Sequence, residues 1–312
     1  MTIDAHAHIF DALRGRVGAG LIRPLSGGKE RIGGGRAIRF LPPLAGEVRF
    51  SPEMLLEHMD HAGVRKAVLL QGPFYGDQND YVLQAVRRWP KRLVGAAYLD
   101  PWSKHPREDF ERLVIRMGFR IVKLELSEAT GLAGLHPGLR IDDPRLAWFW
   151  EEAQRRQIVV ALDLGRVGGK AYQTRSIARL VGRYAHLNIV IAHLAQPPLA
   201  APDHPRLDIL WQEQVRLARH PSVWLDLASL PAYAIAAGED YPYPSARHYL
   251  RRAVALAGAE KILWGSDIPA ALLNDTYPQL LGWVTRHCTF LSRSDLAKIL
   301  GENAGTVYGL ST

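Results

Sequence analysis

The stretch IDAHAHIF, residues 3–10, places three polar side chains at alternate positions of an apolar run. Side chains alternate between the two faces of a β-strand, so we expect Asp4, His6 and His8 to share one face. Three buried polar groups need partners, because burying them unpaired is unfavourable. Histidine is the commonest metal ligand, so the spacing predicts a metal or catalytic site. A pair of hydrogen-bonded core histidines is the alternative.

Other titratable residues stand at or near the ends of short apolar runs. The runs IVKLEL, VVALDLG, IVIAHLAQP, VWLDLAS and ILWGSDIP contain Lys123, Glu125, Asp163, His193, Asp226 and Asp267. In a parallel barrel the carboxyl ends of the strands meet at the face where catalytic residues lie, so these side chains are expected to converge. Histidine and carboxylate ligands suit zinc or manganese, and the lack of cysteine ligands argues against a structural zinc site. For Asp226 a purely structural role is the alternative.

Apolar runs alternate with amphipathic helical patterns along the chain. Strands are expected at residues 2–9, 66–71, 93–99, 121–126, 158–164, 189–193, 223–227 and 262–265. Helical patterns cover residues 52–62, 79–89, 106–117, 144–157, 171–184, 205–219, 245–257, 278–287 and 294–300, and a turn is expected at Gly301. Strands separated by helices indicate parallel βαβ units. Eight such units predict a single (β/α)8 barrel over residues 1–312.

Residues 11–50 interrupt this alternation. The segment is rich in glycine and arginine and has no strong period. A connection of this length is usually functional or disordered. Because it follows the first strand, it would leave the barrel at the face where active sites are built. We interpret it as a lid or substrate loop, and a mobile insert without a chemical role is the alternative.

The composition excludes several classes of protein. The chain has 312 residues, of which 47% are hydrophobic and 22% are charged, as is typical of a soluble globular protein. It shows no membrane-spanning run or signal peptide, and Cys288 is the single cysteine, so a cytoplasmic enzyme without disulfides is expected. The net charge of +8 fits attraction of a small anionic substrate. Nucleic acid is not expected, because no basic stripe with interleaved aromatic residues occurs. A homodimer is one option.

Four motifs together resemble the amidohydrolase superfamily: IDAHAHIF, AHL at residues 192–194, LWGSDIP at 263–269 and ILGENAGTVYGL at 299–310. More narrowly, the chain resembles the amidohydrolase-related group, which contains metal-dependent hydrolases, lactonases and decarboxylases. The resemblance covers nearly the whole chain. It implies one divalent metal held by His6, His8 and Asp267, with zinc favoured over manganese. It also implies an acid/base role, or a further metal contact, for His193.

One position departs from the group's pattern. Where a histidine usually follows the fifth strand, this chain has Asp163. A carboxylate there can still bind zinc or manganese, so Asp163 is expected as a metal ligand. A metal-free site, as in the lactonase branch of the group, is the alternative. A carboxylated Lys123 that bridges metals is a further option, and an ion pair of Lys123 with Glu125 or Asp163 is favoured over it.

The first functional hypothesis is a metal-dependent hydrolase of a small anionic substrate, a lactone or amide that carries a carboxylate. Metal-activated water would attack the carbonyl, Asp267 would take the water's proton, and His193 would protonate or orient the departing group. Arginines of the insertion would hold the carboxylate. The expected substrate-binding residues are Lys123, Glu125, Tyr75, Asn79 and Arg39, with Arg16, Arg36 and Asp77 as further candidates.

Three other functions are compatible with the same sequence. A nonoxidative decarboxylase would deliver a proton to carbon in place of the attack by water. A metal-independent lactonase would use the same barrel without a cation. A non-catalytic ligand-binding barrel is the third, and its difficulty is that unused buried charges are unfavourable.

Overall fold

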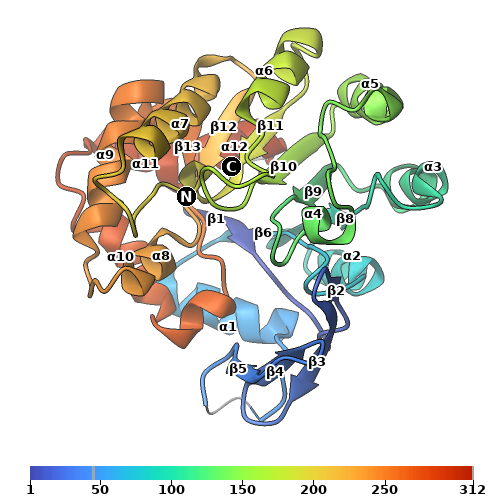
Figure 1. Ribbon diagram of the computed structural model, residues 1–312. Coiled ribbons are helices and arrows are strands. Elements are labelled where there is room, and N and C mark those ends of the chain that lie inside the picture. The colour runs from blue at the N-terminus through green and yellow to red at the C-terminus, as the bar shows by residue number, and fades with distance from the viewer. Residues whose placement is uncertain (44–45, 311–312) are drawn as a thin grey trace.

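A ring of parallel strands surrounded by helices forms the body of the protein (Figure 1). The computed structural model describes residues 1–43 and 46–310. The barrel strands are β1 (Ile3–Ala7), β6 (Lys66–Leu69), β7 (Leu93–Gly95), β8 (Ala97–Tyr98), β9 (Ile121–Glu125), β10 (Val159–Asp163), β11 (Ile189–Ile191), β12 (Val223–Asp226) and β13 (Ile262–Leu263). Only Ala96 separates β7 from β8, so these two form one strand of the barrel. Every strand predicted from the apolar runs is therefore present.

Hydrogen bonds between the first and last strands close the sheet. The strands pair in the orders β1-β6-β7 and β8-β9-β10-β11-β12-β13. Ala5 N donates to Trp264 O over 3.0 Å, and His8 N donates to Ile268 O over 2.9 Å. The amide of Asp267 donates to the carbonyl of His6 over 2.8 Å. The predicted (β/α)8 barrel is confirmed.

The outer layer consists of helices that follow the barrel strands. Their bounds are α1 (Pro52–Ala62), α2 (Asn79–Arg88), α3 (Pro106–Phe110), α4 (Leu132–Leu135), α5 (Ala147–Arg155), α6 (Thr174–Arg183), α7 (Pro205–Arg216), α8 (Leu230–Ala236), α9 (Pro244–Ala257), α10 (Tyr277–Thr285), α11 (Arg293–Ala297) and α12 (Asn303–Tyr308). Shorter 3-10 and π-helical segments extend several of them. The sequence pattern missed α4 and α8, which are short helices in the connections near the cavity.

The chain end corrects one prediction. No turn occurs at Gly301, because the π-helical segment η7 (Lys298–Glu302) continues through it into α12. A Cβ at Gly301 would lie 2.0 Å from the carbonyl oxygen of Met1, so glycine permits a close approach of backbones. The C-terminal helix α12 then packs on the barrel strands in a cluster that contains Ile3, Ile121, Val159, Val190, Leu263, Ala304, Val307 and Tyr308.

The first strand contains an irregularity that separates Asp4 from the two histidines. Its register shifts between Asp4 and Ala7, and a bulge reverses the alternation of side chains. The Asp4 carboxylate accepts hydrogen bonds from Ser266 N (2.9 Å) and from Tyr277 Oη (2.7 Å) of the outer helix α10. The prediction that Asp4 shares a face with His6 and His8 is therefore wrong.

A small antiparallel sheet fills much of the insertion. Its strands β2 (Arg16–Val17), β3 (Gly20–Leu25), β4 (Lys29–Ile32) and β5 (Ala37–Arg39) pair in sequence order and lie at the edge of the ring (Figure 1). Phe10 and Phe50 exchange two backbone hydrogen bonds of 2.9 Å, which hold the ends of the insertion together. Phe40 packs against Phe74 with 5.1 Å between ring centroids. The strands went unpredicted because arginine and glycine obscure any alternation.

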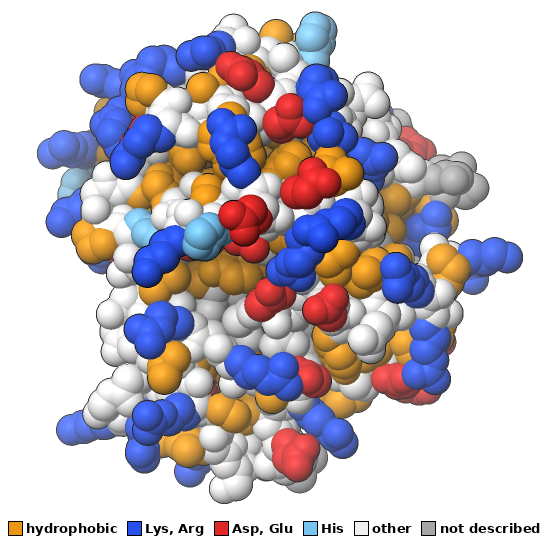
Figure 2. Space-filling model, turned by 90° about the vertical axis from the view of Figure 1, so that its right-hand side faces the viewer, with side chains coloured by type: hydrophobic (Ala, Val, Ile, Leu, Met, Phe, Trp, Pro, Cys, Tyr) orange, Lys and Arg blue, Asp and Glu red, His pale blue; other side chains and the backbone are white. Residues whose placement is uncertain are grey.

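The surface carries the excess of positive charge in a dispersed form. On the face in Figure 2, lysine and arginine side chains are interspersed with acidic and apolar ones. No helix in residues 1–43 or 46–310 is long and apolar enough to cross a membrane.

Candidate active site

A cavity of about 870 Å³ opens at the carboxyl ends of the barrel strands. Strand-end residues line its floor, and Glu30, Ile38, Arg39 and Phe40 of the insertion line its side. The cavity brings together these residues predicted from the sequence: His8, Arg39, Tyr75, Lys123, Glu125, Asp163, His193 and Asp267. His6 lies directly beneath, fully buried, within 3.2 Å of Lys123.

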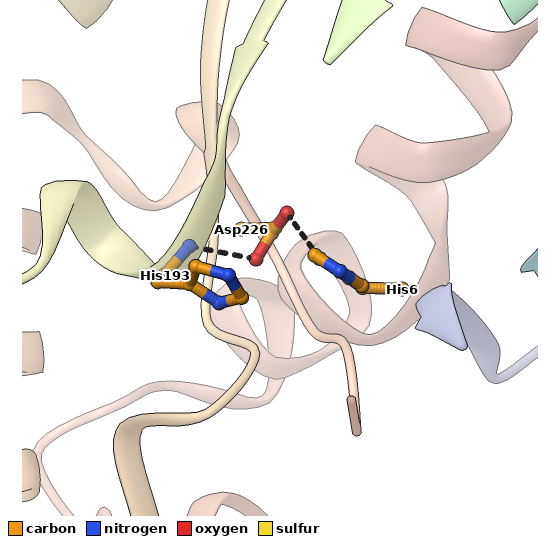
Figure 3. Close-up of side chains that lie close together, drawn as sticks. All are labelled: His6, His193 and Asp226. Carbon is orange, nitrogen blue, oxygen red and sulfur yellow. Dashed lines mark hydrogen bonds and ion pairs between the residues drawn. The ribbon is translucent and has the colours of Figure 1, made fainter. Parts of the chain in front are cut away.

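Asp226 connects the two histidines at the base of the site (Figure 3). Its Oδ2 lies 3.1 Å from His6 Nδ1, and its Oδ1 accepts the backbone N–H groups of His193 and Ala228, each over 3.0 Å. A carboxylate only accepts, so His6 Nδ1 carries the hydrogen and its Nε2 has a free lone pair. Burial and the charge of Lys123 lower the pKa of His6, so its ring is neutral.

His8 and Asp267 form a contact that needs a proton or a metal ion. The His8 Nδ1 lies 2.8 Å from the carbonyl oxygen of Leu70 and must donate to it. The His8 Nε2 lies 3.0 Å from Asp267 Oδ1. Burial lowers the pKa of His8 to about 4, despite its hydrogen bond with Asp267, which favours the neutral ring. A neutral ring presents a lone pair at Nε2, so its contact with the carboxylate is then favourable only with a cation close to both atoms.

The donor set fits a divalent metal. Donor atoms of His6, His8 and Asp267 lie within 4.8 Å of one another. Two neutral imidazoles and a carboxylate match the three protein ligands of catalytic zinc sites, and Asp226 supplies the outer partner that orients such a histidine. His6, His193 and Asp226 satisfy the same distance criterion. There, however, both Asp226 oxygens already accept N–H groups, so this second group is a hydrogen-bonded network.

His193 carries a positive charge on the opposite side of the cavity floor. Its Nδ1 donates to the Ala228 carbonyl over 3.0 Å, and its Nε2 lies 3.1 Å from Asp163 Oδ2. Because both partners are acceptors, both ring nitrogens carry hydrogen. Burial alone would lower the pKa of His193, but the carboxylates of Asp163, Asp267 and Asp226 outweigh it and raise the pKa to about 9.

Asp163 faces His193 and not the two neutral histidines. Its Oδ1 also accepts from Gly165 N and Gln196 Nε2, each over 3.0 Å. Burial would raise the pKa of Asp163, yet the charges of His193 and Lys123 hold it well below its usual range. Within the described part of the chain, Asp163 belongs to neither group of clustered donors. Its role as a metal ligand remains a prediction.

A left-handed turn after β11 aims His193 and Gln196. Residues 193–196 all have positive φ angles, between 46° and 59°. Four consecutive non-glycine residues in this region are strained and persist only when surrounding contacts hold them. Trp211 Nε1 donates to the Leu194 carbonyl over 2.9 Å, and Tyr172 Oη donates to the Ala195 carbonyl over 2.8 Å. These contacts hold the turn in place.

Lys123 and Glu125 extend side by side from β9 into the site. Lys123 Nζ lies 3.2 Å from His6 Nε2, where it donates to the free lone pair. Glu125 Oε1 accepts from Thr130 Oγ1 over 2.5 Å and from Ser127 Oγ over 3.1 Å. Burial and the neighbouring Asp163 raise the pKa of Glu125 to about 7. Glu125 is therefore poised between its neutral and charged forms near neutral pH.

Two predicted pocket residues lie elsewhere. Asn79 bonds through both amide atoms to the backbone of Tyr98, over 2.9 and 3.0 Å, and joins α2 to the barrel. It does not line the cavity. Asp77 lies 3.1 Å from Arg112 in a partly exposed ion pair. Sequence reasoning missed these lining residues: Glu30, Ser127, Glu128, Thr130, Arg166, Gln196, Ser229 and Tyr233.

Comparison with known proteins places the chain in a family. The amidohydrolase family model matches residues 3–310, so the chain belongs to the amidohydrolase family, a class of hydrolases. The resemblance seen in its motifs is thereby confirmed.

Individual relatives agree with this assignment. The chain is 26% identical to an L-fucono-1,5-lactonase of Burkholderia ambifaria over 83% of this chain and 85% of the relative. An amidohydrolase of Burkholderia multivorans, solved with HEPES and again with zinc, has TM-scores of 0.75 and 0.73 at 19% and 18% identity, over 100% of both chains. A 2-pyrone-4,6-dicarboxylic acid hydrolase of Acinetobacter baumannii has a TM-score of 0.69 at 18% identity over 99% of both chains.

Proposed function

We propose that the protein hydrolyses a hydroxylated lactone to the corresponding hydroxy acid. One observation carries the proposal: the Asp267 carboxylate and the His193 imidazolium face one cavity beside two neutral histidines. This arrangement offers a base, an acid and a cation site to a single ester group. Similarity to a lactonase that acts on a sugar lactone supports this substrate class.

Two residues of the chain move the protons of the reaction. Asp267 accepts the proton of the attacking water, because its Oδ1 faces His8 at the cavity floor and its Oδ2 accepts from Ser229. His193 stabilises the developing oxyanion and gives its proton to the ring oxygen that departs as an alcohol. The ester C–O bond breaks, and water supplies the new hydroxyl of the carboxylic acid. Lys123, Arg39 and Arg166 surround that product with positive charge.

A divalent metal fits the base of this site. His6 Nε2, His8 Nε2 and Asp267 would hold it, and zinc is favoured over manganese because two ligands are imidazoles. When bound, such a metal polarises a carbonyl and acidifies water. A zinc-bound amidohydrolase of the same fold supports this choice.

A metal-independent lactonase is the second candidate. Lys123 Nζ already donates to His6 Nε2, the atom that a metal would need. The Lys123 amine therefore occupies the position of a metal and can donate a hydrogen bond there without one.

The inserted sheet covers one side of the cavity and acts as its lid. Phe40 joins the aromatic cluster formed with Phe10, Phe74 and Tyr75. Tyr75 in turn stacks on His8 with 4.5 Å between ring centroids. Closure over a lactone would exclude bulk water, which strengthens the charges of the site.

The experiment measures acid release in weak buffer from two lactones, a six-carbon sugar 1,5-lactone and unsubstituted δ-valerolactone, and carbon dioxide release from a dihydroxybenzoate. We expect hydrolysis of the lactones and no release of carbon dioxide from the aromatic acid, and we expect Asp267→Asn to be inactive. Carbon dioxide release without lactone hydrolysis would support the decarboxylase alternative and overturn the proposal. Elemental analysis and chelation of the same sample decide between the two candidates: full activity in metal-free protein favours the role of Lys123.

A further inference from the structure

Glu30 is a carboxyl group without a partner at the cavity wall. It lies on β4, opposite Pro24 of β3 and Ile38 of β5. The side chain is 2% exposed, and its Oε2 has no hydrogen-bond partner among residues 1–43 and 46–310. The group nevertheless lines the cavity. The hydrogen-bonding capacity of Oε2 is therefore unused among the residues that the structure describes.

The surroundings of Glu30 make this arrangement unfavourable by itself. Its neighbours across the sheet are apolar, and Phe40, Phe74 and Tyr75 line the same cavity. Burial raises the pKa of Glu30 to about 7, and no cationic partner opposes the rise. An unpaired buried carboxyl destabilises a fold, so the sheet holds it at a loss of stability.

We propose that Glu30 determines substrate specificity by accepting hydrogen bonds from hydroxyl groups of the lactone, at the end remote from the reacting ester. The inference rests on the proposed function and adds to it the residue that recognises the substrate. Glu30 stands on the insertion, whereas His193 and Asp267 lie in the segments that follow the barrel strands β11 and β13. Recognition and chemistry thus belong to different parts of the chain.

The charges of the cavity favour hydroxyl groups as the ligands of Glu30. Glu30 is itself a carboxyl group, so a substrate carboxylate placed against it would meet a like charge, whereas Arg39, Lys123 and Arg166 line other parts of the cavity. Hydroxyls donate to carboxylates in strong charge-assisted hydrogen bonds. A site built to pair substrate hydroxyls also rejects analogues that lack them, because its own polar groups are then left unpaired.

The test compares Glu30→Leu and Glu30→Gln with wild type on the sugar lactone and on δ-valerolactone. For Glu30→Leu we expect kcat/KM for the sugar lactone to fall about 10- to 100-fold, mostly through KM. Activity on δ-valerolactone, which lacks hydroxyl substituents, should not fall. Glu30→Gln should recover part of the loss, because its amide oxygen still accepts. Glu47→Gln, an exposed acid of the same insertion, is the control and should behave as wild type.

Equal losses on both lactones, or no loss on either, would overturn the inference. Calorimetric binding of the hydroxy acid derived from the sugar lactone provides a second readout that needs no turnover. If the wild type binds this acid but hydrolyses no lactone, the proposed function fails while weaker binding by Glu30→Leu still supports the role of Glu30. If neither variant nor wild type binds it, the inference fails.

Discussion

The base of the cavity and the wall formed by the insertion differ in how their buried polar groups are paired. At the base, Asp226 accepts three N–H groups, and both ring nitrogens of His193 have acceptors. On the wall, Glu30 is equally buried, and its Oε2 has no partner in the part of the chain that the structure describes. The hydrogen bonds of Asp226 and His193 are formed before any substrate arrives, whereas the partner that we propose for Glu30 is a hydroxyl group of the substrate.

This difference separates two requirements of an enzyme. Charges that act on a reacting bond work best when they are held in advance, because no reorganisation is then needed during the reaction. Groups that discriminate between substrates work through the penalty of remaining unpaired with the wrong one. Four changes test whether the two regions differ in this way.

The largest effect is expected from replacing Asp267, the carboxylate at the base of the cavity that is proposed to react. Asp267→Asn keeps the shape of the side chain but removes its negative charge and its ability to take a proton. We expect kcat to fall by about a thousandfold, within the range of lost acid/base catalysis. Zinc content after identical purification should fall as well. Activity within tenfold of wild type would contradict the role of Asp267.

The next effect concerns the connecting carboxylate. Asp226→Asn replaces one acceptor oxygen by an N–H donor in a network that offers only donors. Loss of such an outer partner typically lowers metal affinity or activity 10- to 100-fold. We expect this loss in kcat together with a lower Tm. Ser222→Ala, a buried change at the opposite end of β12, is the matched control.

The third effect is a pH dependence of stability. The folded-state pKa of His193 is raised to about 9, above an unfolded value near 6.5. Its contribution is therefore full below about pH 6.5 and is lost as the pH rises through about 9. We expect the Tm to fall between pH 7 and pH 10, and the fall to be smaller in Asp163→Asn. Identical profiles for the two proteins would show that the ion pair is absent.

The smallest expected effect is a gain in stability, and it concerns Glu30 on the wall. Glu30→Leu removes an unpaired carboxyl, so it should raise the Tm at pH 8 by about 1–2 °C for each kcal/mol gained. Since the folded-state pKa of Glu30 is raised to about 7, the penalty is present only above its unfolded value, and the gain should shrink at pH 4. Glu47→Gln should leave the Tm unchanged. A lower Tm would mean that Glu30 has a stabilising partner.

Periodicity was sufficient to predict the barrel but not every direction of a side chain. The strand runs and their helices follow from alternation and from helical spacing, which burial enforces. The direction of the Asp4 side chain was predicted wrongly because a bulge in β1 reverses the alternation of side chains. The residue types around a bulge do not reveal it. The turn predicted at Gly301 was wrong because this glycine allows close packing of the backbone against Met1 and does not form a turn.

Site residues that directly follow strands could be predicted from the sequence, whereas those in irregular loops could not. His8, His193 and Asp267 end apolar runs, so the barrel brings them together. Gln196 and Ser229 reach the cavity through left-handed backbone that no sequence pattern announces. Glu30 was missed because the insertion lacks a visible strand pattern. Asn79 was predicted to line the pocket because the sequence does not reveal its hydrogen bonds with the backbone of Tyr98, which lies on β8.

The paired hydrogen bonds between Phe10 and Phe50 make the insertion a module that is closed at its two ends. Because its two ends are already joined at the barrel rim, the length and content of the segment between them can change at little entropic expense to the barrel. Descendants of such a chain can acquire new substrate preferences by altering this one surface module. The residues proposed to cleave the ester bond lie outside this module and need not change with it.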